Sequence, residues 1–220
     1  MGEVELHSAT GELIIRSVFH FYGDAASPAL ATQIAAGIQE HWNAPQAAIT
    51  IRKTRYEVQF VITGNYESNL NPGKVWYNDN PQLNFFRIEN DVIGNISFVD
   101  GIGSNTGYFK LDNLLQTSST AAHEYGHTLG LVHPKTTDIR GGLHPGIMFP
   151  RGTLCDPELQ YDPHAQAAAP GGVLDPSHRS VGLEDIQLLN LHKLDFNDHG
   201  FARLGEFTSI YHEKHEAGFG

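Results

Sequence analysis

The chain has 220 residues, of which 40% are hydrophobic and 18% charged, and its formal net charge at pH 7 is −11 with neutral histidines. This composition predicts a globular protein of one domain, and the apolar runs are too short for membrane insertion. The acidic balance argues against a nucleic-acid-binding protein and, more weakly, against a protein that binds anionic membrane surfaces.

The first half of the sequence predicts a strand-rich unit with one long helix. Apolar and polar residues alternate over 4–23, with a turn at Thr10 and Gly11, which predicts a hairpin or two strands. Ser27 and Pro28 suit the start of a helix over residues 27–43, whose apolar side chains recur at helical spacing. Further strands are predicted within 47–54, 55–66, 84–89, 94–100 and 106–112, whereas 71–84 is rich in turn-forming residues.

The second half predicts two helices separated by a long irregular segment. The first helix begins near Leu111 or Ser118 and ends at Leu129. Residues 135–180 are rich in Pro, Gly, Asp and Ala, and loops of this length inside a domain usually carry function or are mobile. Residues 181–194 predict the second helix, and 202–214 a last strand.

The segment from His123 to His133, "HEYGHTLGLVH", carries a metal-binding pattern. Four-residue spacing places the imidazoles of His123 and His127 on the same face of a helix, one turn apart. Gly130 can adopt a left-handed conformation and end that helix, so that His133 turns back as a third ligand. Three imidazoles would leave one coordination position of a tetrahedral Zn²⁺ open, as in catalytic zinc sites.

Glu124 is the expected catalytic residue, because it lies beside the first ligand and can reach a water on the metal. Zinc lowers the pKa of such a water and polarises a carbonyl, and Glu124 can take the proton and pass it to a leaving amine. These residue types predict a zinc-dependent hydrolase. The alternative is a helix that contains histidines by coincidence.

The same segment resembles the HExxHxxGxxH signature of the metzincin metallopeptidases. "PGIMFP", Pro145 to Pro150, is similar to the methionine turn of that clan in its matrixin form, and Pro134 is closer to the serralysin branch. The resemblance covers roughly residues 13 to 195 and is specific at the metal site, and it implies a zinc-dependent endopeptidase with Glu124 as the catalytic base.

This resemblance implies an α+β fold, in which a twisted mixed β-sheet with the active-site helix stands above a smaller, mostly irregular C-terminal subdomain that ends in a helix. The whole chain, 1–220, is then one catalytic domain, with an upper subdomain to about residue 132 and a lower one over about 133–220. Met148 would form an apolar floor under the metal, although a simple core position explains it too. An extended peptide would pair with an edge strand, either within 95–101 or at 108–111.

Several features depart from the family or stay open. Ca²⁺ could bind through Asp100, Asn105 or Asp112, but a polar hairpin explains them equally well. Cys155 could bind the zinc and hold the enzyme latent, but a free thiol without a role is the simpler interpretation. His144 could be a fourth ligand or assist the transition state, but a loop histidine is the simpler interpretation. His212 and His215 could trap metal or enter the cleft, although we expect a solvated terminus.

No Sec signal peptide and no pro-segment are visible, so export by another route or after leader removal is favoured over a cytoplasmic location. We expect a monomer that acts on polypeptides and binds no nucleic acid, with a protein inhibitor as an open option. Two alternatives remain: a narrow-target protease toxin or effector delivered without a Sec signal, and a non-catalytic zinc-binding module on the same fold.

Overall fold

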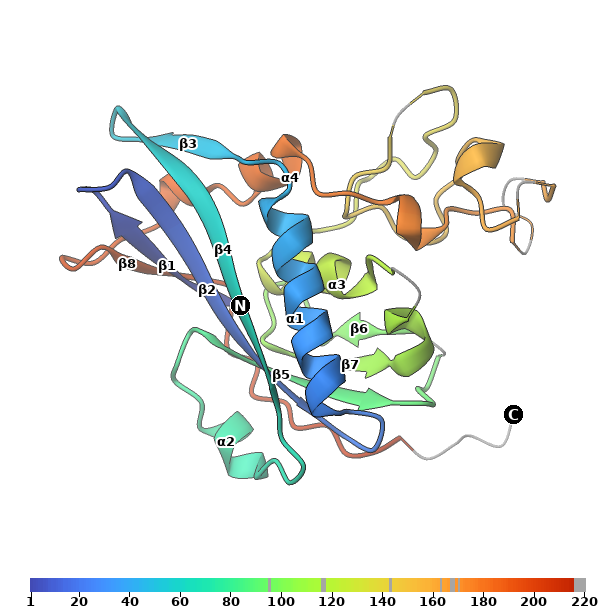
Figure 1. Ribbon diagram of the computed structural model, residues 1–220, viewed down its shortest axis with the longest axis horizontal. Helices are drawn as coiled ribbons and strands as arrows, with labels where there is room; N and C mark the ends of the chain where they lie inside the picture. The colour runs from blue at the N-terminus through green and yellow to red at the C-terminus, as the bar shows by residue number, and fades with distance from the viewer. Residues whose placement is uncertain are drawn as a thin grey trace.

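The computed structural model describes residues 1–94, 96–115, 118–142, 144–162, 164–166, 169 and 171–215. Within them, strands form one curled mixed sheet, and few helices accompany it (Figure 1). The arrangement is consistent with the predicted α+β class. No helix of the described part is both long and apolar enough to cross a membrane.

The sheet is built around the long strand β2 (Glu12–Tyr22). The main path runs β3-β4-β2-β5-β7-β6, while β1 pairs with β2 and β8. Neighbours of β2 are parallel at β4 and β5 and antiparallel at β1, so the sheet is mixed as predicted. The other strands are β1 (Gly2–His7), β3 (Ala48–Ile51), β4 (Thr54–Tyr66), β5 (Leu83–Glu89), β6 (Phe98–Val99), β7 (Thr106–Lys110) and β8 (Phe201–Leu204).

Helix α1 (Pro28–Asn43) lies across one face of the sheet, with α3 (Thr120–Thr128) beside it (Figure 1). Ser27 caps α1 as expected, because its hydroxyl accepts a hydrogen bond from the Leu30 amide at 3.2 Å. The buried face of α1 carries the apolar residues that recur at helical spacing. Their burial against the sheet forms the main hydrophobic core: Leu30, Ile34, Ile38 and Trp42.

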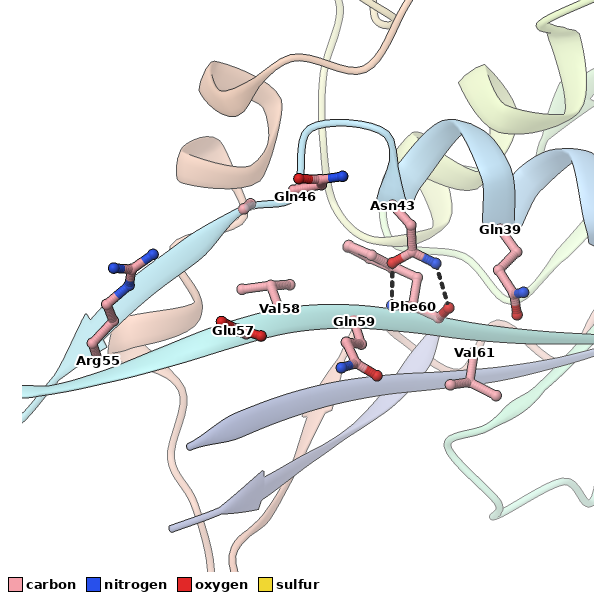
Figure 2. Close-up of a pocket in the computed structure, with 10 residues that line it drawn as sticks. Gln39, Asn43, Gln46, Arg55, Glu57, Val58, Gln59, Phe60 and Val61 are labelled. Atoms are coloured by element: carbon pink, nitrogen blue, oxygen red, sulfur yellow. Dashed lines mark hydrogen bonds between the residues drawn. The ribbon is translucent and has the colours of Figure 1, made fainter. Parts of the chain in front are cut away.

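Beyond β3, the edge of β4 is closed by side chains from α1 (Figure 2). The Asn43 side chain donates to the Phe60 carbonyl and accepts from the Phe60 amide, both at 2.9 Å. Gln39 accepts from the Ile62 amide at 3.0 Å. Unpaired main-chain groups of an edge strand attract other strands, and these amide side chains occupy them instead.

The irregular segment between the two predicted helices is irregular in the structure too, with isolated bridges and the short 3-10 turns η2 (Pro157–Leu159) and η3 (Pro176–His178). Helix α4 (Leu183–Leu188) is shorter than the predicted 181–194, because Asn190 adopts a left-handed conformation and starts the 3-10 turn η4 (Leu191–Lys193). The turn-rich stretch 71–84 contains the short helix α2 (Pro72–Trp76) and the beginning of β5.

The expectation of a solvated C-terminus is wrong for Tyr211, His212 and His215, whereas Glu213 and Lys214 are exposed. After β8 has paired with β1, the chain returns to the sheet instead of extending into solvent. The Tyr211 ring stacks on Tyr22 with centroids 5.4 Å apart, and the His212 side chain is only 13% exposed. The aromatic surface of the sheet explains this packing, since burying it stabilises the fold. Residues 216–220 lie outside the described part.

The edge closure of β4 can be tested with Asn43→Ala. This change leaves the Phe60 amide and carbonyl without partners, so the free energy of unfolding should fall by about 1–3 kcal/mol in urea titrations. Asn65→Ala is the matched control, because Asn65 lies in the same strand and is exposed. The control should change stability by less than about 0.5 kcal/mol. Equal effects of the two changes would contradict the closure.

Candidate metal centre

Helix α3 is anchored from its inner side by Tyr125, which stands between the two histidines in the sequence. The Tyr125 ring is fully buried and meets Trp42 and Phe19 edge-on, with centroids 5.6 and 5.7 Å apart. Its hydroxyl lies 2.8 Å from the Ser17 hydroxyl on β2. This anchoring turns the opposite side of the helix, with His123 and His127, towards the cleft.

Both helical histidines are oriented by main-chain carbonyls. His123 Nδ1 donates to the Ile147 carbonyl at 2.7 Å, and His127 Nδ1 donates to the Leu131 carbonyl at 2.8 Å. A carbonyl oxygen can only accept, so the proton of each neutral ring is on Nδ1 and the Nε2 lone pair is free. A metal-binding histidine is typically fixed in this way.

The chain reversal after the helix brings in the third histidine, as predicted. Gly130 has φ of 101°, the Leu131 amide donates to the Gly126 carbonyl at 3.0 Å, and the Gly130 amide donates to the His127 carbonyl at 3.0 Å. This pair of bonds is the Schellman ending of a helix, which needs a left-handed residue. His133 follows three residues later and returns over the helix.

Three imidazole nitrogens converge at one point. His133 Nε2 lies 3.1 Å from His123 Nε2 and 3.0 Å from His127 Nε2. The Nε2 atoms of His123 and His127 carry lone pairs, and a single N–H on His133 can point at only one of these two atoms. The remaining pair of nitrogens would then face each other with two lone pairs, unless a cation lies between them. Nitrogens bound to tetrahedral zinc at about 2.0–2.1 Å are about 3.3 Å apart. The donor set therefore fits a metal ion after a small outward shift.

The imidazoles are suited to metal binding at neutral pH. Burial lowers the pKa of all three, and the nearby Arg179 guanidinium lowers each of them further. The pKa of His123 falls well below its usual value. Neutral rings have the lone pairs that a metal requires, so protons compete only at lower pH.

Glu124 lines the same cleft as the three histidines and is 7% exposed. Burial raises the pKa of its carboxyl to about 8, and the Arg179 charge opposes part of that rise. A divalent cation nearby would favour the ionised carboxylate. The side chain is thus placed to exchange a proton near neutral pH when the metal is bound.

Met148, for which a floor under the metal or a simple core position was predicted, is buried in the main core and packs against helix α3 at Gly126. Met148 is 2% exposed, and a Cβ added at Gly126 would lie 2.3 Å from its sulfur. Glycine in the middle of a helix is otherwise unfavourable, so this position is explained by the close approach of Met148. The sequence pattern alone indicates no role for Gly126.

Arg179 is a further residue of the site that the sequence did not reveal. Its Nε donates to the Ser119 hydroxyl at 2.9 Å, its Nη1 donates to the Phe149 carbonyl at 3.0 Å, and Nη1 also lies 3.0 Å from His123 Nδ1. Burial lowers the pKa of Arg179 to about 10, which leaves it charged at pH 7. A lone arginine in a loop rich in Pro and Gly gives no local signal of this contact.

The cleft has a volume of about 320 Å³ and is bounded by α3 and the edge strand β6 with its flanking residues. Of the two strands considered for peptide pairing, β6 lies at the end of the sheet path and β7 lies inside it. A cavity of about 550 Å³ lies along β4, but it contains none of the expected catalytic residues (Figure 2). The cleft wall at β6 consists of Ile96, Ser97, Phe98, Val99, Gly101 and Ile102.

Other residues singled out in the sequence lie outside this centre. Among the described residues, the three imidazoles are the group of His, Cys, Asp and Glu side chains that could hold a metal ion. Of the expected Ca²⁺ ligands, Asp100 pairs with His212, Asn105 bonds Thr208, and Asp112 pairs with Lys110.

The positions of Cys155 and His144 agree with the simpler predictions, a thiol without a role and a loop histidine. Cys155 is buried in an apolar cluster with Ile139 and Leu174, and burial raises the pKa of its thiol. His144 is exposed and lies 3.4 Å from the Ser180 hydroxyl, outside the trio.

Neither known protein-family models nor curated proteins match this chain. Only the geometry of the chain's own residues therefore supports a metal site at this position.

The contact between Gly126 and Met148 predicts that an alanine at position 126 lowers the free energy of unfolding, whereas Gly→Ala in a helix usually raises it. In an exposed helix interior, Gly→Ala stabilises by about 1 kcal/mol. Gly37→Ala in α1 should do so, because a Cβ there meets nothing within 4 Å. Gly126→Ala should instead destabilise by about 1–3 kcal/mol, since its Cβ would overlap the Met148 sulfur. In a Met148→Ala background this penalty should shrink, and stabilisation by Gly126→Ala in the unaltered chain would contradict the contact.

Metal binding can be measured directly by titration of the chelator-treated protein with Zn²⁺. We expect one zinc ion per chain, and His127→Ala should weaken binding by more than about 100-fold. His144→Ala is the matched control and should bind like the wild type. Affinity should stay level near pH 7 and fall only below the ordinary histidine pKa of about 6.5, because burial lowers the pKa of all three imidazoles and protons occupy them only at lower pH. Undiminished affinity in His127→Ala would refute the three-histidine site.

Proposed function

We propose that this chain is a zinc-dependent endopeptidase with a metzincin-type catalytic domain. The observation that carries the proposal is the convergence of His123, His127 and His133 beside Glu124, in a cleft bounded by a sheet edge. The geometry of three imidazoles leaves room for a fourth, open position on the metal. The Met148 floor and the Schellman turn at Gly130 support the metzincin resemblance.

Zinc bound at this site would supply a Lewis acid that lowers the pKa of a coordinated water and polarises a peptide carbonyl. The residues of the chain provide the remaining steps. Glu124 accepts the proton of the attacking water and transfers it to the leaving amine, which becomes a free amino terminus as the C–N bond breaks. The Ile147 and Leu131 carbonyls hold two imidazoles in place throughout.

An extended polypeptide suits the shape and polarity of the cleft. Strand β6 pairs with β7, and among the described residues no other strand pairs with it, so a peptide can add along its outer side. Exposed apolar side chains flank the site: Ile96 and Ile102 on the wall, and Val132 next to His133. Exposed apolar groups beside a cleft favour a substrate with apolar side chains near the cleaved bond.

The proposal is tested by digestion of a diverse mixture of unfolded peptides with the zinc-loaded protein. Wild type should cleave, and Glu124→Gln should lower kcat by about 100-fold or more while it still binds zinc. His144→Ala should cleave at the wild-type rate, which would show that the loss of activity is specific to Glu124 and does not follow from changing a loop histidine. The absence of cleavage by a wild-type protein with one bound zinc would contradict a general endopeptidase.

A further inference from the structure

The C-terminal segment, residues 206–215, lies on the face of the sheet opposite α1 and α3. Phe86 and Phe109 belong to the main core, so their neighbours Arg87 and Tyr108 point to the other face. The segment contacts that other face, because Arg87 donates to the His212 carbonyl at 3.2 Å and the His215 ring stacks on Tyr108. In Figure 1 the red chain runs below β5 on its way to the C-terminus.

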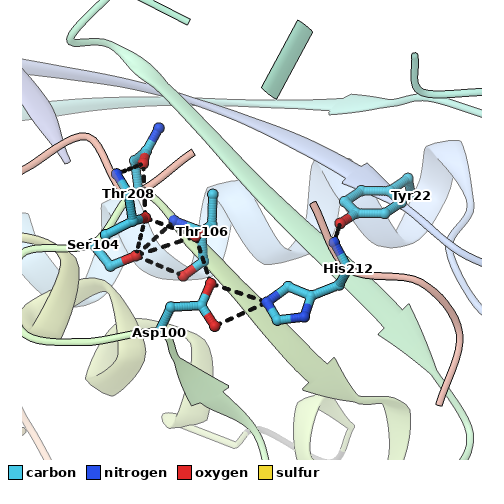
Figure 3. Close-up of polar contacts among 7 residues, drawn as sticks. Tyr22, Asp100, Ser104, Thr106, Thr208 and His212 are labelled. Carbon is cyan, nitrogen blue, oxygen red and sulfur yellow. Dashed lines mark hydrogen bonds and ion pairs between the residues drawn. The ribbon is translucent and has the colours of Figure 1, made fainter. Parts of the chain in front are cut away.

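Polar side chains tie this segment to the loop between β6 and β7 (Figure 3). His212 Nε2 lies 2.9 Å from both carboxylate oxygens of Asp100. Thr208 donates from its amide to the Asn105 side chain at 3.0 Å, and its hydroxyl lies 2.6 Å from that of Ser104. The Asp100 and His212 side chains are 7% and 13% exposed, so water screens their interaction little.

The tethered loop is also the wall of the cleft. Asp100 directly follows β6, and its neighbours Val99, Gly101 and Ile102 line the cleft with the histidines. Gly103 then joins two elements, because its amide donates to the His127 carbonyl at 2.7 Å and its carbonyl accepts from the Glu206 amide at 2.7 Å. The wall is therefore held between the metal-binding helix on one side and the C-terminal segment on the other.

Strand β6 needs such support because it is very short. It pairs with β7 through two residues, Phe98 and Val99. Two-stranded pairings of this size are marginal by themselves. The position of the peptide-binding edge then depends on the groups that fix its ends, of which Asp100 is one.

We propose that residues 206–215 form a brace that holds the peptide-binding edge in register, with His212 and Asp100 as its positioning residues. This inference rests on the proposed endopeptidase function, since a braced edge matters for an extended substrate. Among the described residues, neither Asp100 nor His212 hydrogen-bonds to a metal ligand or to Glu124, so the brace acts on substrate binding and leaves the zinc site unchanged.

The experiment compares His212→Ala, His212→Gln and Lys214→Ala by peptide kinetics, zinc titration and amide hydrogen exchange. His212→Ala should raise KM about tenfold with kcat within about threefold, because a hydrogen bond to a charged group is lost. Exchange should speed up at residues 98–103, and zinc affinity should not change. His212→Gln retains an N–H donor and should restore most of the KM.

Lys214→Ala is the matched control, because Lys214 belongs to the same segment but pairs with Asp24 where both side chains are more than half exposed. It should leave KM and exchange at wild-type values. If His212→Ala fails to fold, Asp100→Asn takes its place; it removes the charge but keeps an acceptor, so KM and exchange should rise in the same direction by a smaller factor.

Unchanged exchange at residues 98–103 in a folded His212→Ala protein would overturn the brace, as would an effect on kcat alone. If wild type cleaves no peptide, the endopeptidase proposal fails by itself, and the exchange measurement still decides whether the segment braces the edge.

Discussion

Burial of the Tyr125 ring is the constraint on which the candidate site depends. The ring fills a space between Trp42 of α1 and Phe19 of β2, and its hydroxyl meets Ser17. Because Tyr125 lies between His123 and His127 in a rigid helix, fixing one side of the helix fixes the direction of both imidazoles. The core between α1 and the sheet thus determines where the imidazole nitrogens point, and rings held in this way would need little reorganisation to bind an ion.

The second contribution comes from the segment beyond the helix, which packs against the histidines and the start of α3. The Ile147 carbonyl orients His123, Met148 fills the space left by Gly126, and Arg179 joins the helix start to the Phe149 carbonyl. Asp185 at the start of α4 has a pKa raised by burial, and hydrogen bonds from the Gly182 and Ile147 backbones oppose that rise. An irregular chain with little regular secondary structure is therefore held by specific polar contacts around the histidines.

The parts that could be predicted from the sequence are local ones. The Ser27 cap, the spacing of His123 and His127 and the turn at Gly130 each depend on residues within a few positions, and the structure contains all three. The strand order, the contact of Arg179 with His123 and the packing of the tail depend on residues far apart in the chain. The identity of a side chain alone does not indicate such contacts. Helix α4 was predicted too long because no strong sequence signal indicates the left-handed conformation of Asn190.

The closure of β4 by Asn43 has a consequence for association. Two edges of the sheet differ in whether their main-chain hydrogen-bonding groups are occupied. Along β4, the amide and carbonyl of Phe60 bond the Asn43 side chain, whereas β6 is the last strand of the sheet path and lies beside the cleft. A second copy of the protein gains no hydrogen bonds by adding a strand at Phe60, so the sheet cannot extend into a fibre through that position. The fold thus blocks strand addition at one position of the sheet border, whereas the outer side of β6 has no paired strand among the described residues.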